Sequence, residues 1–283
     1  MPGDHAPEAA ILHPMLLPLL SLVTALLYGA LAWYCRRRTS PDGGPGVERL
    51  LLAPLLLHGA LLYVSIFTAQ GVNIGLGNAI SVITWVTLIL YAVSSVRYHL
   101  RALTPVVLPI AAVGALLPLL LRDSHVVPYG GYALFHAHFA AAFLAYALFT
   151  IAAVHGIVMA FAEKRLHTRQ PSALAGLPPL MTMEQLLFRL IGAGFLLLTL
   201  TLLSGMLFAE ELFGRPFSFA HFTQHKTVFA ALSWLFYGAL LLGRRVYGWR
   251  GRTALILSLA GFFTLLLAYV GTKTVLEMLL HRG

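Results

Sequence analysis

Eight long apolar runs alternate along the chain with short polar connections, and each run approaches the length of a membrane-spanning helix. A bilayer core of about 30 Å requires about 20 apolar residues in helical conformation. The fifth run is long enough to tilt or to project beyond the bilayer. The pattern predicts an all-α, polytopic transmembrane helical bundle that forms a single domain over residues 1–283, with spans at about 14–34, 50–69, 79–97, 104–121, 133–161, 186–208, 227–243 and 253–276.

The connections are too short to hold a separate soluble domain. The longest lies at about 162–185 and contains Pro171, Pro178 and Pro179. Because proline marks turns and loops, this segment is predicted to be a loop.

Composition supports the membrane interpretation. Hydrophobic residues make up 59% of the chain and charged residues only 10%, whereas about 25% of a typical soluble domain is charged. The net charge of +9 does not indicate a nucleic-acid partner, because the basic residues are confined to short connections and form no basic stripe. The single cysteine, Cys35, excludes a disulfide framework and a cysteine-rich metal site.

The basic residues predict the orientation of the spans, because cytoplasmic connections of membrane proteins are enriched in Lys and Arg. Five of the 19 basic residues lie in one set of connections: Arg122, Arg215, Lys226, Lys273 and Arg282. The other 14 lie in the alternate set: Arg36, Arg37, Arg38, Arg49, Arg97, Arg101, Lys164, Arg165, Arg169, Arg189, Arg244, Arg245, Arg250 and Arg252. Both termini are therefore predicted outside, in a multi-pass protein of a bacterial inner membrane.

The sequence lacks the motifs of several enzyme and transporter classes. It contains no H-E-x-x-H, no G-x-S-x-G elbow and no G-x-x-x-x-G-K-[ST] loop. No carboxylate lies in the middle of a predicted span, where ion-coupled transporters carry one. We therefore expect a protein that is not an enzyme.

Histidines are the notable polar residues of the spans. His58 lies in the middle of the second span, His136 and His138 open the fifth, His155 lies deeper in it, and His225 opens the seventh. Helical geometry places His136 and His138 about 200° apart, so one site can use only one of them. A neutral imidazole is less costly to bury than a charged group, and it is a good ligand for iron or zinc.

Each of these residues also has a purely structural interpretation. His136 fits a side chain wetted at the headgroups, His155 fits a hydrogen bond to a neighbouring helix, and His58 fits either a structural or a ligand role. The 209–226 connection contains Phe213, Phe217, Phe219 and Phe222. These rings could form a platform for a flat macrocycle or an interfacial aromatic belt.

Several stretches resemble the cytochrome c assembly protein family and, within it, the YpjD branch. In the fifth span, His138 is followed eight residues later by Tyr146, as in the family. A looser match in the amino-terminal half runs from Leu57 to Tyr63. The other matching stretches are LPPLMTMEQLLFRLIGAGFLLLTLTLLSG (177–205), HKTVFAALSW (225–234), GWRGR (248–252) and GFFTLLLAYVGTK (261–273).

The resemblance implies haem as cofactor, held between membrane helices at the outer face for cytochrome c-type biogenesis. It implies His138 and His225 as axial ligands of the haem iron and His58 as a buried haem-binding residue. The partners it implies are cytochrome c maturation components. The tryptophan-rich outer segment of haem-delivering members is absent, which favours haem binding without handover. The alternative is a membrane partner or regulator of a divalent-cation export system, with structural or metal-binding histidines.

The predicted orientation has a direct test. An alkaline phosphatase reporter fused after Gly283 should be active, because this enzyme folds only on the outer side. The same fusion made with a cytoplasmic reporter should be inactive. The opposite pair of results would mean an odd number of spans or a miscounted 104–121 segment.

Overall fold

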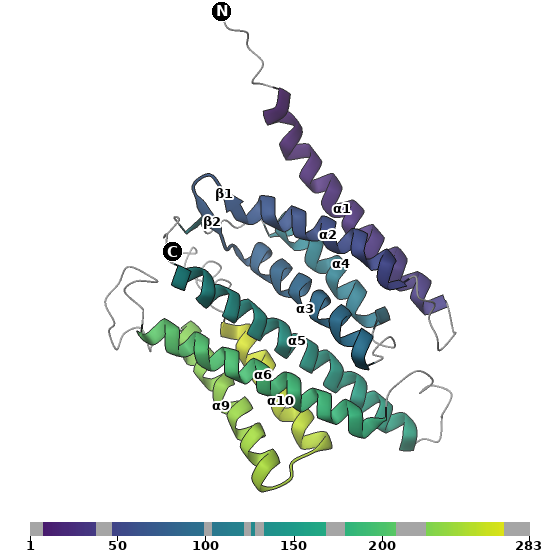
Figure 1. The fold of residues 1–283 in the computed structure, drawn as a ribbon, viewed down its shortest axis with the longest axis vertical. Coiled ribbons are helices and arrows are strands. Elements are labelled where there is room, and N and C mark those ends of the chain that lie inside the picture. Colours follow the sequence, from purple (N-terminus) through teal and green to yellow (C-terminus); the bar gives the residue numbers. More distant parts are fainter. Residues whose placement is uncertain are drawn as a thin grey trace, which may run out of the picture. The chain divides into compact units, whose positions relative to one another are not determined.

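The computed structural model describes residues 8–37, 47–98, 104–121, 126–127, 133–167, 179–207 and 225–268. Within these ranges the chain forms eight helices and three short strands, drawn in Figure 1. The helices are α1 (Glu8–Arg37), α2 (Val47–Ile66), α3 (Leu76–Tyr98), α4 (Thr104–Leu120), α5 (Ala133–His167), α6 (Leu180–Leu207), α9 (His225–Val246) and α10 (Gly251–Leu266). The strands are β1 (Phe67–Thr68), β2 (Gly71–Asn73) and β3 (Val126–Val127).

Each helix coincides with one predicted span, and the all-α architecture is confirmed. Six helices (α1, α2, α3, α5, α6 and α9) are long and apolar enough to cross a membrane. The other two, α4 and α10, are equally apolar but have only 17 and 16 residues. At 1.5 Å per residue, α4 is about 25 Å long, slightly less than the hydrocarbon core. The chain is a multi-pass membrane protein, and the side on which its termini lie stays a prediction.

The predicted loop at 162–185 is wrong at both ends, where the structure is helical. The fifth helix continues to His167 and the sixth begins at Leu180. Residues 162–167 read AEKRLH, mostly strong helix formers that are too polar to count as part of an apolar run. With 35 residues, α5 is about 52 Å long, so it projects beyond a bilayer core, as its apolar length suggested.

The end of the second predicted span is also wrong, because the helix stops at Ile66 and a small sheet begins. Strand β1 pairs antiparallel with β2 through Phe67↔Val72 and Thr68↔Gly71. Strand β2 pairs antiparallel with β3, which gives the order β1-β2-β3. Gly71 has a φ of 152°, a conformation that residues with a Cβ rarely adopt, and this permits the tight reversal.

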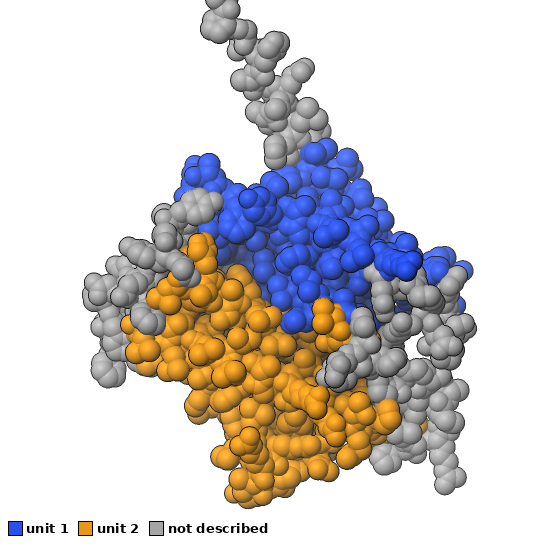
Figure 2. All heavy atoms as spheres, in the orientation of Figure 1, with its two compact units in different colours: residues 1–92, 104–129 blue, residues 93–103, 130–283 orange. Residues whose placement is uncertain are grey.

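The chain divides into two compact units, coloured separately in Figure 2. The first comprises residues Met1–Ala92 and Thr104–Tyr129, and the second Val93–Leu103 and Gly130–Gly283. In the first unit, α1 packs against α2 and α4. In the second, α5 packs against α6 and α10, and α9 packs against α6 and α10.

Glycines allow the helices of the first unit to approach closely. A Cβ on Gly114 of α4 would overlap the Thr84 side chain of α3. A Cβ on Gly59 of α2 would lie 2.7 Å from the Trp85 ring, whose Nε1 donates to the Leu55 carbonyl at 2.9 Å. Small residues at helix contacts are typical of membrane proteins, where helices associate by close packing.

Stacked aromatic rings form the centre of the second unit. Phe149 of α5 and Tyr237 of α9 are fully buried, with ring centroids 3.8 Å apart and planes within 7° of parallel. Gly194 of α6 lies against the Phe149 ring, and Gly261 of α10 lies against the Tyr237 ring. The Tyr237 hydroxyl donates to the Ser258 carbonyl at 3.3 Å. One stacked pair therefore joins the four helices that the structure describes in this unit.

This packing predicts different effects for two glycines of α6. In Gly194→Ala, the new methyl would lie 2.8 Å from a Phe149 ring that Tyr237 prevents from moving, so we expect a loss of about 1–3 kcal/mol in unfolding free energy. Gly192→Ala is the control, because nothing lies within 4 Å of a Cβ there. Since both changes gain the same helix propensity, thermal unfolding in detergent isolates the packing effect. Equal melting temperatures for the two variants would contradict the packing described above.

Candidate functional site

His138 lies in the second turn of α5 and faces α6. Its Nδ1 is 2.8 Å from the Ser204 hydroxyl oxygen, and a Cβ on Gly205 would lie 3.4 Å from its Cε1. The ring therefore rests on the last turns of α6, where glycine leaves room for it. His138 is half-buried, at one end of the α5–α6 pair.

Ser204 also has an acceptor within its own helix, which bears on the tautomer of His138. The Ser204 hydroxyl lies 3.1 Å from the Thr201 carbonyl, to which it can donate its single proton. In that arrangement Nδ1 of His138 carries the ring proton and donates to the Ser204 oxygen, and the lone pair is on Nε2. Metal-bound imidazoles have this arrangement, in which one ring nitrogen ligates and a hydrogen bond fixes the other. Ser204 was not singled out by the sequence, which shows only one more hydroxyl in an apolar span.

Aromatic rings continue along α5 from the same turn. Phe135 and Phe139 have centroids 4.6 Å apart, and Phe139 and Phe143 are 6.2 Å apart. Phe139 also meets the His138 ring edge-on at 5.6 Å. Residues four apart lie on one helix face, so these rings form an apolar column beside the imidazole.

His136 is exposed and does not share the setting of His138. Its ring contacts that of Phe135 edge-on, with centroids 5.7 Å apart. The roughly opposite directions of the two histidines agree with the helical geometry expected from their spacing.

The second proposed iron ligand, His225, is the first residue of α9. Its side chain lies outside the described residues, as do Phe213, Phe217, Phe219 and Phe222 of the preceding connection. The pairing of His138 with His225 and the aromatic platform therefore stay predictions.

His58 is buried in the first unit, where both ring nitrogens have protein partners. Tyr28 of α1 donates its hydroxyl proton to the Pro54 carbonyl at 3.1 Å. Nδ1 of His58 lies 3.4 Å from the Tyr28 oxygen, and Nε2 lies 2.9 Å from the Ser81 hydroxyl of α3. The ring joins α1, α2 and α3, so ligation of a metal through Nε2 would require the Ser81 bond to break. The haem-binding role expected of His58 stays a prediction that this geometry does not favour.

His155 is fully buried between α5 and α6. Its Nε2 donates to the Met183 carbonyl at 2.9 Å, the bond to a neighbouring helix that the sequence suggested. Its Nδ1 has no hydrogen-bond partner among the described residues. One donated bond explains why this imidazole is tolerated in a span, and it fixes α5 against the start of α6.

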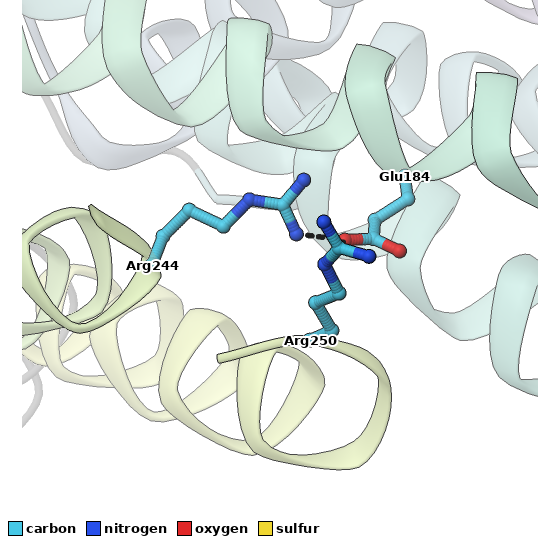
Figure 3. A network of polar contacts seen from close by, with 3 residues as sticks. All are labelled: Glu184, Arg244 and Arg250. Atoms are coloured by element: carbon cyan, nitrogen blue, oxygen red, sulfur yellow. Dashed lines mark hydrogen bonds and ion pairs between the residues drawn. The ribbon is translucent and has the colours of Figure 1, made fainter. Parts of the chain in front are cut away.

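An ion-pair cluster at the other end of α6 was not predicted. Glu184 pairs with Arg244 of α9, and its Oε1 lies 3.6 Å from Nε of Arg250. Figure 3 shows the two arginines approaching Glu184. Nothing in the sequence pattern indicates this pairing, because the two arginines are 60 and 66 residues away from Glu184 in the chain. Within the described ranges, no three His, Cys, Asp or Glu side chains gather into a metal site.

The chain is similar to several known membrane proteins. It is 26% identical over 210 residues to the inner membrane protein YpjD of Escherichia coli, covering 74% of this chain and 78% of that protein. It is 31% identical over 212 residues to the "Uncharacterized 28.8 kDa protein in nifR3-like 5'region" of Azospirillum brasilense, covering 72% and 77%. It is 40% identical over 91 residues to the cytochrome c biogenesis protein CcsA of Prochlorococcus marinus, covering 32% and 28%.

No solved structure matches the chain significantly. The family model described as "Cytochrome C assembly protein" matches residues 48–280, which include seven of the eight helices almost completely and all the histidines discussed above. The resemblance seen in the sequence is therefore confirmed, and the chain belongs to the cytochrome c assembly protein family.

Proposed function

We propose that this protein is a haem-binding protein of the bacterial inner membrane that handles haem at the outer face during cytochrome c-type biogenesis. Membership of the family supports a role in cytochrome c-type biogenesis, since the related CcsA is by name a cytochrome c biogenesis protein. Similarity to YpjD, which is by name an inner membrane protein, supports the location. We further propose that it acts as a carrier or chaperone and not as an enzyme.

The observation that carries this proposal is the bond between His138 and Ser204. Haem supplies an iron that takes imidazole nitrogen as an axial ligand. In His138, the Nδ1–H donates to Ser204 and Nε2 carries the lone pair, the form that an iron ligand requires. His138 also lies beside the Phe135–Phe139–Phe143 column, and an apolar wall suits the faces of a porphyrin.

His225 is the proposed second ligand, because it opens α9 on the same predicted side as the start of α5. We propose a structural role for His58, because its two ring nitrogens already have partners on α1 and α3.

A haem spectrum tests the proposed ligand. Protein expressed with added haem precursor and purified in detergent should show a Soret band with low-spin visible bands. His138→Ala and His225→Ala should each abolish the low-spin spectrum, since each removes an axial nitrogen. His136→Ala is the matched control, because it removes an exposed imidazole two residues away and should leave the spectrum nearly intact.

Two results would overturn this proposal. If His136→Ala lost the low-spin haem spectrum while His138→Ala kept it, the wrong histidine would have been assigned as the ligand. A colourless preparation after haem supplementation would favour the other candidate, a membrane partner of a divalent-cation exporter whose histidines are structural. The bonds that bury His58 and His155 are of this structural kind.

Ser204→Ala tests the proposed tautomer. Removing a hydrogen-bond partner of a metal-bound imidazole typically lowers affinity about 10–100-fold, so haem titration should show weaker binding by that factor. Thr201→Ala is the control, because that hydroxyl bonds only the Leu197 carbonyl of its own helix. Equal haem affinity in Ser204→Ala and Thr201→Ala would contradict a role for Ser204 in orienting the ligand.

A further inference from the structure

The turn between α9 and α10, residues 244–252, has a well-defined conformation. Gly248 and Gly251 have φ values of 67° and 52°, so the chain reverses through left-handed positions that glycine adopts without strain. Trp249 folds back on α9. Its backbone N–H donates to the Gly243 carbonyl at 3.2 Å, and its ring occupies the space that a Cβ on Gly243 would fill. The side chains of the 244–252 turn are therefore carried on a fixed backbone.

Glu184 of α6 holds two arginines of this turn in place. Arg244 pairs with its Oε1, and Nε of Arg250 lies 3.6 Å from the same oxygen (Figure 3). The Arg244 guanidinium also lies over the Phe188 ring, 4.3 Å from its centroid. Each guanidinium has five N–H donors, and one shared carboxylate cannot satisfy ten.

The turn carries a surplus of positive charge. Arg245 and Arg252 are both exposed, and neither has an ion pair in the described part of the chain. Within the described ranges, the four arginines of these nine residues have ion-pair contacts with one carboxylate, that of Glu184. Guanidinium groups bind phosphate oxygens through paired, charge-assisted hydrogen bonds.

Exposed apolar side chains lie beside the exposed arginines on the same helix faces. Leu242 is three residues before Arg245 on α9, and Ile256 is four residues after Arg252 on α10. Leu242 is 62% exposed and Ile256 is 54% exposed. Because residues three and four apart are neighbours on a helix, each exposed guanidinium has lipid-facing apolar surface next to it, one turn further into the span. Tyr247 lies between Arg245 and Arg252 in the chain and is 73% exposed. Its amphipathic ring is typical of the membrane interface.

We propose that the 244–252 turn is a binding site for an anionic phospholipid, with the headgroup phosphate on Arg245 and Arg252 and the acyl chains along Leu242 and Ile256. A free phosphate would use only the arginines, whereas a lipid uses both the charged and the apolar surface. Glu184 contributes by fixing Arg244 and Arg250 in place. Because its single carboxylate offsets only one of these two charges, the pair still leaves a net positive charge beside the site.

The test is titration of the detergent-purified full-length protein with phosphatidylglycerol or phosphatidylcholine, followed by native mass spectrometry to count bound lipids. The wild type should retain phosphatidylglycerol in preference to phosphatidylcholine. The double variant Arg245→Gln/Arg252→Gln should bind phosphatidylglycerol about 30-fold more weakly, since it loses two attractions between an arginine and an anionic headgroup. Arg245→Lys/Arg252→Lys should keep most of the binding, because it keeps the charge.

The matched control is Arg36→Gln/Arg37→Gln, which removes the same charge from two exposed arginines at the end of α1. It should bind phosphatidylglycerol like the wild type. Equal losses in the two glutamine variants, a lysine variant no better than the glutamine one, or absence of any preference for phosphatidylglycerol would overturn the proposal. So would displacement of the lipid by millimolar inorganic phosphate, which would make the site one for a free anion.

Discussion

A polar side chain buried within the spans of this protein can find hydrogen-bond partners only in protein, because the lipid core offers none. Three histidines find such a partner on another helix. His58 bonds to Ser81 of α3, His138 to Ser204 of α6, and His155 to the Met183 carbonyl of α6. Each bond joins helices that the apolar surface alone would not hold in one register, since lipid tails are as apolar as the helix faces.

Two of these bonds fix the α5–α6 pair near its opposite ends. His138 and His155 are about 25 Å apart along α5, and their partners Ser204 and Met183 are about 31 Å apart along α6 in the reverse direction. Antiparallel helices joined at two such points cannot slide past each other without breaking a bond. The intervening contact of Gly194 with the Phe149 ring makes the same register a requirement of packing. The proposed ligand is thus carried on the most firmly connected helices of its unit.

The charged side chains of the ion-pair cluster occupy different positions in the helices from the buried neutral imidazoles. Glu184, Arg244 and Arg250 lie at helix ends and not in mid-span, where an unpaired charge would be costly. Pairing with one carboxylate holds the arginines without cancelling their charge. The end of the α6–α9–α10 group therefore combines a fixed shape with a positive field, which is the basis of the proposed lipid site.

Apolar run length predicted the approximate place of each described helix, since a bilayer imposes a minimum length on each span. The same pattern was wrong where a polar segment is helical or an apolar one is not. The polar AEKRLH segment after the fifth apolar run is helical, and a strand follows Ile66 within the second predicted span. At the site, spacing separated His136 from His138, because a helix turns 100° per residue. The spacing does not reveal which of these two side chains is directed toward a neighbouring helix.

The partners of each functional side chain were decided only by the tertiary structure. Ser204 is 66 residues from His138, Tyr28 is 30 residues from His58, and Arg244 is 60 residues from Glu184. In the sequence these are isolated hydroxyls and charges with no mutual spacing to reveal them. Composition and periodicity therefore determined that this chain crosses a membrane as helices and contains histidines able to bind a metal. Which partner each imidazole bonds depends on contacts between helices, and those contacts arise from the packing of segments that are far apart in the chain.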